Sequence, residues 1–595
     1  MTLRKIPLTF LILTLSLGAS CAYAKKPPHY YEEARPLTAA QAALINKAIA
    51  QEKVIIRNIQ QHTPLVETYL QETRPNALLN HIPVGDYYML SRVDFGKAFF
   101  DKPYKARDQA KHGFFSGSHA AMSRLSALLG LEKYTYNPSG FMDMMFVDPK
   151  GFNTQNYQFS FVRYQFLGSV RTAVFNVFPL VRGMGRFIGQ IWVEDPGGNI
   201  VRFNGTYTGP RSRDGSKYFF HFDSWRMEIQ PGLWLPAAVY VQEAHRTASK
   251  KSSGLMAQTH FWGYSLKLPQ QSSQNVSMQV ENAVDQSGKG QNVGPLQASR
   301  MWVQQAAQNV IDRLVQAGLV APARAGGYEH KILDQIAINL IVPNNLAFPE
   351  QVRCRVLLTD TIEATTVGDT ILLSRGLINT LPNEPAFASV IAMELAHIAL
   401  GQHVNTSYAF SDRLLFPDES TFQRINLGHT PAENEAAAKL AMKYLENSMY
   451  KNELPEAGLY YEQLMDWSSA LKAMNTPEVG DSLLNAQGVP WMDALEKMAP
   501  KIDWTNLNQT AALPLGSWIK IDPWNDTVHQ LHAARYAPLN ASEKMPFEVT
   551  PIYYNLQHYT VAQNQTPATP GGQHAAQSAP NAASAQQPAG TATNP

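Results

Sequence analysis

The sequence predicts an α+β protein with an amino-terminal antiparallel β domain, a mainly helical domain after it and a disordered tail. Three observations support this fold class. Apolar and polar residues alternate along much of 80–269, which is the period of β-strands. From 297 onward, apolar residues recur at helical spacing. Residues 562–595 have almost no large apolar side chain, so burial cannot offset the entropy lost on ordering them.

Residues 1–24 have the three parts of a secretory signal. Arg4 and Lys5 precede an apolar stretch over 6–15, and Ala-Tyr-Ala at 22–24 provides a cleavage site. The apolar stretch is shorter than the roughly 18–20 residues that span a bilayer. We therefore expect an exported chain, periplasmic or secreted, that has no transmembrane segment once the signal is removed.

The net charge and the cysteine count of the chain without its signal exclude some functions and one source of stability. The formal net charge is +2, and removal of Arg4 and Lys5 brings it to 0, which gives no basis for binding nucleic acid. Of the two cysteines, Cys21 leaves with the signal and Cys354 remains, so no disulfide can form within the mature chain. Packing must therefore stabilise the fold.

The first element of the mature chain is a helical segment within 25–79, where apolar residues recur at helical spacing until Pro75. Residues 80–269 follow as an antiparallel β domain with one helix at 120–129. Its strands are expected at 187–193, 200–203, 218–225, 235–243 and 260–268, the first two joined as a hairpin through Asp-Pro-Gly-Gly-Asn.

A linker at 270–296, rich in Gln, Ser, Asn and Gly, leads to a mainly helical domain over 297–475. Within that domain we expect helices at 301–319, 384–403 and 431–446 and strands at 353–358 and 370–373. An extension over 476–561 is expected to pack on this domain, with a strand and turn at 518–524. Residues 562–595 form the tail.

The residues that suggest chemistry are Met393-Glu394-Leu395-Ala396-His397 within the expected helix at 384–403. Zincin-type metallopeptidases place two histidines four residues apart on one helix face, where they bind Zn²⁺, and the Glu between them polarises the bound water. Here Glu394 and His397 are present, but Met393 stands at the first histidine position. A thioether is a soft ligand that suits Cu(I) rather than Zn²⁺.

Residues 297–475 resemble the HtpX and CAAX prenyl endopeptidase family of gluzincins. Residues 368–377 stand where that family has a glycine-containing strand and a short helix before the zinc helix. Glu-Asn-Glu-Ala-Ala at 433–437 stands where the family has Glu-x-Glu-Ala-Asp. The resemblance implies a gluzincin-like domain with Glu394 as the catalytic residue and His397 and Glu433 as zinc ligands. It also implies that Ala437 replaces the Asp that orients the first zinc histidine.

Because the first ligand and its orienting Asp are lost together, the resemblance implies that zinc catalysis is lost. The leading prediction is a non-catalytic homologue in the cell envelope that binds a polypeptide and needs no zinc. The alternative is an active zinc metalloendopeptidase in which His403 or His429 replaces the missing ligand. In either case the partner is a polypeptide or lipoprotein of the envelope.

The β domain resembles the half-barrels of the LolA and LolB lipoprotein carriers. The residues that carry this likeness lie at 189–193, 200–203 and 233–236. The resemblance implies an apolar cavity, and it gives a third functional prediction, the binding of a lipid or lipoprotein by the β domain. The alternative is that its aromatic residues belong to the core or to the sheet surface; these are Trp192, Phe203, Trp225 and Trp234.

Overall fold

The computed structural model divides the chain into a compact unit over Met1–Gln557 and a second unit over His558–Pro595. The residues it describes all belong to the first unit; they are 36–76, 80–95, 100–103, 142–167, 170–180, 186–207, 219–244, 254–266, 295–321, 328–348, 351–402, 427–501, 519–521 and 528–530. The expected signal at 1–24, the helix at 120–129 and the tail at 562–595 lie outside these residues, as does nearly all of the linker at 270–296. The domain boundaries drawn through them stay predictions.

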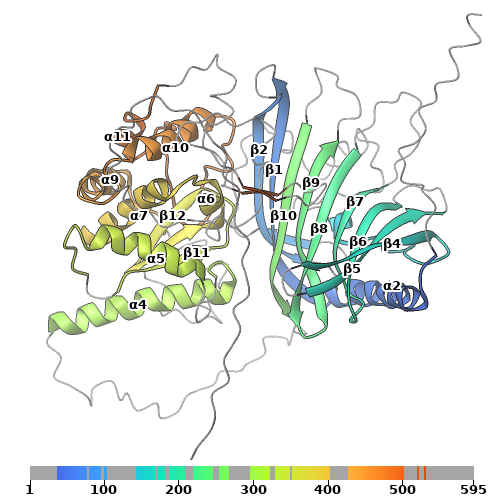
Figure 1. The fold of residues 1–595 in the computed structure, drawn as a ribbon. Coiled ribbons are helices and arrows are strands. Elements are labelled where there is room, and N and C mark those ends of the chain that lie inside the picture. Colours follow the sequence, from blue (N-terminus) through green and yellow to red (C-terminus); the bar gives the residue numbers. More distant parts are fainter. Residues whose placement is uncertain are drawn as a thin grey trace, which may run out of the picture. The chain divides into compact units, whose positions relative to one another are not determined.

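The predicted fold class is confirmed: a large antiparallel sheet is followed by a mainly helical region (Figure 1). The sheet contains β1 (His62–Asn76), β2 (Asn80–Asp94), β3 (Phe100–Pro103), β4 (Tyr157–Leu167), β5 (Val170–Pro179), β6 (Phe187–Glu194), β7 (Ile200–Tyr207), β8 (Phe219–Gln230), β9 (Leu233–Ala244) and β10 (Gly254–Leu266). Their order is β3-β2-β1-β10-β9-β8-β7-β6-β5-β4, and each neighbouring pair is antiparallel. The expected hairpin is present as β6 and β7.

The helical prediction was wrong for the second half of the segment before Pro75. Helix α2 (Ala39–Ile59) begins with a capping box between Thr38 and Gln41 but ends at Ile59, and β1 follows. Strand β1 lies between β2 and β10, and every residue over 65–70 is buried. A strand buried on both faces has no alternation of apolar and polar residues, so its period could not be recognised.

Helix α2 lies across one face of the sheet (Figure 1). Its apolar residues join a core of strand aromatics that includes Phe203, which is 0% exposed. Glu52 of α2 enters the same core and forms a two-pronged ion pair with Arg226 of β8, at 2.7 and 2.8 Å. This pair fixes the helix against the sheet, because each charge would be costly to bury without the other.

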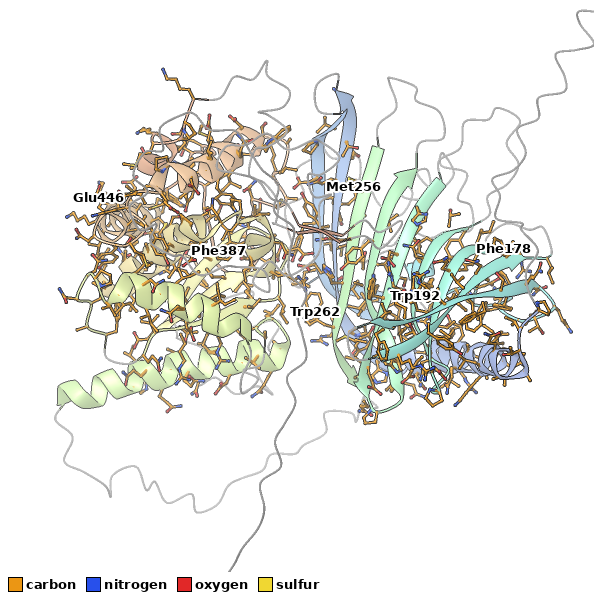
Figure 2. The ribbon with its side chains drawn as sticks, in the orientation of Figure 1. Phe178, Trp192, Met256, Trp262, Phe387 and Glu446 are labelled. Carbon is orange, nitrogen blue, oxygen red and sulfur yellow. The ribbon has the colours of Figure 1, made fainter. Side chains whose placement is uncertain are left out.

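The second face of the sheet carries a smaller aromatic cluster. Trp192 and Trp234 are buried there, and Figure 2 labels Trp192 within β6. The guanidinium of Arg202 lies 4.4 Å from the ring centroids of both Trp192 and Trp225 and is paired with Asp223. Three of the four aromatics that the alternative assigned to the core or the sheet surface are therefore buried: Trp192, Phe203 and Trp234.

The helical region is built around a four-stranded sheet of order β11-β13-β12-β14. Its elements are α4 (Pro295–Ala317), α5 (Tyr328–Ile341), β11 (Arg353–Leu357), β12 (Glu363–Val367), β13 (Thr370–Ser374), α6 (Arg375–Thr380), α7 (Glu384–Ala399), α9 (Pro431–Glu446), α10 (Leu454–Trp467), β14 (Asp481–Ser482) and α11 (Asp493–Glu496). Only β11 and β13 pair in parallel among these strands. Farther along, β15 (Ile519–Ile521) pairs with β16 (Val528–Gln530). Strand β15 lies within the stretch 518–524, where a strand and turn were expected.

Helix α9 has the predicted bounds, whereas the helix expected at 384–403 is shorter. It ends at Ala399, and Gly401 adopts a positive φ of 66°. A glycine in the left-handed region is a common way to end a helix, since other residues adopt it at a cost. Within the described parts of the chain, we find no helix of the length and apolar character that a membrane span requires.

Candidate functional site

Helix α7 forms the centre of the candidate site and is buried on all sides from Glu384 to His397. Asn383 caps its first turn by accepting a hydrogen bond from the Ala386 N–H, and Pro385 stands where a missing N–H does no harm. Its apolar residues surround the whole helix, as is typical of a helix inside a core. Helix α9 packs against it.

The predicted catalytic residue Glu394 and the predicted zinc ligand His397 are buried on α7, at 2% and 0% exposed. Met393 is 4% exposed, and Ala437 on α9 is 0% exposed, so the two replaced positions are also inside the protein. Glu433 differs from the expectation for a zinc ligand. Its Oε2 accepts hydrogen bonds from the backbone N–H and the hydroxyl of Thr430, at 2.8 and 2.7 Å, and these bonds lower its pKa. The carboxylate thus caps its own helix.

Of the two candidate replacement ligands, His429 lies beside His397. The two rings are stacked, with centroids 3.8 Å apart and an interplanar angle of 18°. The side chain of His429 is 2% exposed although the residue precedes α9. The second candidate, His403, lies outside the described residues.

The Nδ1 atoms of His397 and His429 each lie within hydrogen-bonding distance of a side-chain oxygen. The Nδ1 of His429 lies 2.7 Å from Asp481 Oδ2, and the His429 backbone N–H donates to Asp481 Oδ1 at 2.8 Å. The Nδ1 of His397 lies 2.6 Å from Gln402 Oε1. Asp481 belongs to β14, which pairs with the start of β12, so the sheet positions it. The hydrogen bonds fix both ring orientations.

Among the described residues, four buried polar atoms of this cluster have no hydrogen-bond partner. They are Glu394 Oε2, His397 Nε2, His429 Nε2 and Asn434 Oδ1. Buried polar groups nearly always have partners, and each one left without costs about 1–3 kcal/mol.

Burial and neighbouring charges shift the acid–base properties of the three titratable groups. Burial raises the pKa of Glu394 to about 8, although His429 opposes the shift. Burial and the nearby His429 lower the pKa of His397 to about 4. Burial also acts to lower the pKa of His429, but its hydrogen bond to Asp481 and the charge of Glu394 outweigh burial and raise it.

The predicted ligands do not converge with a third metal-binding group. In the described part of the chain, the group of three His, Cys, Asp or Glu residues whose possible ligand atoms all lie within 4.8 Å of one another is Glu67, His260 and Asp360. Glu394, His397, His429 and Glu433 do not meet that criterion as they stand.

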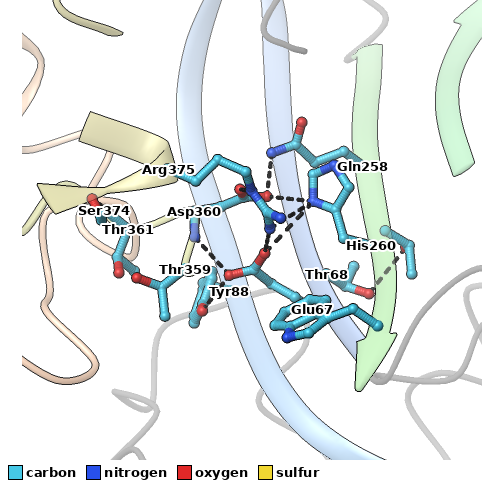
Figure 3. Close-up of polar contacts among 12 residues, drawn as sticks. Glu67, Thr68, Tyr88, Gln258, His260, Thr359, Asp360, Thr361, Ser374 and Arg375 are labelled. Atoms are coloured by element: carbon cyan, nitrogen blue, oxygen red, sulfur yellow. Dashed lines mark hydrogen bonds and ion pairs between the residues drawn. The ribbon is translucent and has the colours of Figure 1, made fainter. Parts of the chain in front are cut away.

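The cluster of Glu67, His260 and Asp360, which no sequence pattern indicated, joins the large sheet to the helical region (Figure 3). Arg375, at the start of α6, contacts both carboxylates: its Nε donates to Asp360 Oδ1 at 2.7 Å, and a terminal nitrogen donates to Glu67 Oε2. His260 of β10 lies 3.0 Å from Asp360 Oδ2. No sequence signal links these residues, because Glu67 and Arg375 are 308 positions apart.

The cluster is an ion-pair network rather than a vacant metal site. The Arg375 guanidinium already supplies the positive charge between the two carboxylates (Figure 3). Glu67 Oε1 also accepts from the Tyr88 hydroxyl and from the Asp360 backbone N–H, each at 2.6 Å. Arg375 and His260 hold Asp360 ionised, and its pKa lies well below the usual range even though burial opposes this. The carboxylates therefore have partners already.

Comparison with known protein families found no family model that matches the chain. No curated protein matches it either. Among solved structures, a LolA superfamily protein from Nitrosomonas europaea matches at 11% identity, covering 39% of this chain and 96% of that protein, with a TM-score of 0.18. The resemblance of the β domain to LolA and LolB and the gluzincin resemblance of 297–475 both stay predictions.

Proposed function

We propose that this chain is an exported protein of the cell envelope that binds a polypeptide through a peptidase-like site and does not cleave it. One observation carries the proposal. The positions where a gluzincin would hold its first zinc histidine and the Asp that orients it are occupied by Met393 and Ala437, both buried. A thioether and a methyl group cannot supply a zinc ligand and its hydrogen-bonded carboxylate.

One further feature supports the absence of hydrolysis. The Oε2 of Glu433 accepts hydrogen bonds from the backbone N–H and the hydroxyl of Thr430 and so caps its own helix. In a gluzincin the carboxylate at this position would bind zinc instead.

An extended segment of the chain itself, residues 479–482, contacts the site, and this supports the binding of an extended polypeptide there. Residues 481–482 add to β12 as the antiparallel strand β14. The Glu363 carboxylate accepts hydrogen bonds from the backbone N–H groups of Val479 and Gly480, both at 2.8 Å. The same segment brings Asp481 to His429. Addition of an extended segment to a sheet edge is a common mode of peptide recognition. We propose that a segment of the partner pairs with the same edge of the four-stranded sheet, where it continues beyond β14.

The test uses the mature chain from Lys25 and an unfolded, fluorescently labelled polypeptide. Fluorescence anisotropy measures binding, and gel electrophoresis of the same samples over a day measures cleavage. The proposal expects saturable binding with the labelled chain intact, with and without added Zn²⁺. Cleavage that disappears in Glu394→Gln would contradict it.

The second candidate function is an active zinc metalloendopeptidase in which His429 is the replacement ligand. The observation that favours it is the stacking of the His429 ring on the His397 ring, where the Nε2 atom of each has no hydrogen-bond partner among the described residues. Zinc-dependent cleavage that is lost in both His429→Ala and Glu394→Gln distinguishes it from the first proposal. The third function, lipid or lipoprotein binding by the β domain, stays a prediction. It would be supported by saturable binding of an acyl-chain probe that persists in the same two variants.

A further inference from the structure

We propose that the outer edge of the large sheet, at β4, binds the surface of a membrane that contains anionic lipids. The residues that would contact the membrane are Val162, Tyr164 and Phe166 of β4 and Arg171 of β5, which we call the edge group. The proposal goes beyond the proposed function, because it concerns a different part of the chain and a different kind of partner. It also differs from the binding of an acyl chain in a cavity, since the edge group is exposed on the outside of the sheet.

The edge group exposes apolar side chains to water. Val162, Tyr164 and Phe166 are 36%, 51% and 67% exposed. Strand β4 is the last strand in the order of the large sheet, so no described strand pairs with its outer side (Figure 1). Single exposed apolar residues are common on protein surfaces, but a group of them on one edge indicates contact with a protein or a membrane.

The exposed rings are attached to the core of the sheet. The centroid of the Tyr164 ring lies 5.0 Å from that of Phe161, which lies 5.7 Å from that of the fully buried Phe175. Phe166 is the cross-strand partner of Arg171, whose guanidinium lies 4.9 Å from the centroid of the Tyr164 ring. Two apolar rings and a cation are therefore held side by side before any partner binds.

The charge of this part of the chain is positive. From 149 to 193 the sequence has five Lys or Arg and no Asp or Glu. Arg163 and Arg171 are both exposed, the latter with 54% of its side chain. Asp195 lies 3.5 Å from Arg171 and offsets part of its charge, but the stretch as a whole stays basic. A Lys or Arg near an anionic membrane surface strengthens binding about fivefold.

The geometry of β4 favours a lipid surface over a protein strand. Its pairing with β5 shifts register between Phe161 and Arg163, so Val162 is an extra residue that interrupts the ladder. A bulge of this kind prevents another strand from pairing along the whole edge. A second copy of the chain would also bring arginines of like charge together. A lipid surface requires no register, and its headgroups supply the negative charge that this edge lacks.

The side chains of the edge group match the boundary between headgroups and acyl chains. The Tyr164 side chain combines an apolar ring with a polar hydroxyl, which suits this boundary. Phe166 is the most exposed of the three apolar residues and would enter farthest among the acyl chains. The long side chain of Arg171 can keep its charged end among the headgroups.

The test is flotation of the mature chain with vesicles of phosphatidylcholine, with and without phosphatidylglycerol. We expect binding to the anionic vesicles that weakens as salt is added, because salt screens exposed charges. Phe166→Ser should bind roughly tenfold more weakly and Arg171→Gln about fivefold more weakly. Met227→Ser on β8 and Arg57→Gln on α2 replace exposed residues of the same kinds elsewhere, and both should bind as the wild type does.

A fluorescent label at the edge gives a second readout. Once the signal is removed, the cysteine that remains is Cys354, which is buried, so Phe166→Cys can be labelled at the new position alone. An environment-sensitive fluorophore there should shift to shorter wavelengths on anionic vesicles. The same fluorophore on Met227→Cys should not shift. Both positions are exposed, so neither variant disturbs the core.

An absence of binding to anionic vesicles overturns the proposal, as does equal binding by the wild type and Phe166→Ser or an equal shift at the two labels. Binding to polyglutamate without binding to vesicles would make the partner an acidic polypeptide instead. Self-association that Phe166→Ser abolishes, again without vesicle binding, would make it a second copy of the chain. None of these results bears on polypeptide binding without cleavage, which anisotropy and gel electrophoresis measure separately.

Discussion

The imidazole rings of His397 and His429 lie stacked with their centroids 3.8 Å apart, one from the buried helix α7 and the other from the residue before the cap of α9. Asp481 holds the Nδ1 of His429. A His and an orienting carboxylate are thus present beside His397, whereas Met393 and Ala437 stand where the gluzincin resemblance implies a zinc histidine and its orienting Asp. The site has a different histidine–carboxylate pair from the one that the resemblance implies.

The replaced positions give the first prediction. Met393→His with Ala437→Asp adds a histidine one turn before His397 and a carboxylate to orient it, so that Glu394 is free to act on water. We expect zinc-dependent cleavage of an unfolded fluorogenic substrate to appear in the double variant. Met393→His alone should be at least tenfold slower, because its ring lacks a fixed orientation.

The control for this reversal is the double variant with Glu394→Gln added, which should be inactive. Equal rates in the single and double variants would show that Ala437 does not occupy the orienting position. A double variant that binds zinc fully yet cleaves nothing would show that the gluzincin geometry is not recovered.

The ion pair between Glu52 and Arg226 gives a prediction about stability. Both side chains are buried, so Glu52→Ala leaves the guanidinium without its partner, and removing one member of a buried pair costs about 3–5 kcal/mol. Urea denaturation followed by tryptophan fluorescence measures the change. Lys497→Ala, which breaks the exposed pair with Asp493, is the control and should leave the midpoint where it is. Similar midpoints for the two variants would mean that Glu52 does not anchor α2.

The cluster at His260 predicts a pH dependence. Burial and Arg375 lower the pKa of His260, but Asp360 and Glu67 outweigh them and raise it above the ordinary value of 6.5. A raised pKa means that the folded protein binds the proton more tightly than the unfolded chain. The stability from this group is therefore fully present below about pH 6.5 and is lost as the pH rises through the folded pKa.

Comparison of the wild type with His260→Gln isolates this contribution, since Tyr240, Asp360, Glu67 and Arg375 remain around the position. Thermal unfolding at pH 5.5 and pH 8.5 should show a larger difference in melting temperature between the two proteins at pH 5.5. A difference that is the same at both pH values, or larger at pH 8.5, would contradict the assignment.

The sequence predicted correctly those elements in which apolar residues either alternate with polar ones or recur at helical spacing. Helix α9 and the hairpin of β6 and β7 have the bounds or the pairing that their spacing indicated. Strand β1 was missed because it is buried on both faces, which removes the alternation that would reveal it. The sequence thus predicts an element well where one of its faces differs from the other.

The candidate site was predictable only in part. His429 was recognised as a possible replacement ligand, but its partner Asp481 is 52 positions away and could not be linked to it. Glu433 was expected to bind zinc, yet the proximity of Thr430 lets it complete a capping box, a local interaction that competes with the distant one. Contacts between distant segments depend on the fold, so the spacing of residues within one segment does not predict them.

Binding without cleavage is tested most directly by incubating the mature chain with a labelled unfolded polypeptide and one equivalent of Zn²⁺, with binding and cleavage measured in the same sample. We predict a saturable rise in anisotropy while the labelled polypeptide stays at full length. Zinc-dependent fragments that are absent with Glu394→Gln would contradict it and would make the protein an active metalloendopeptidase.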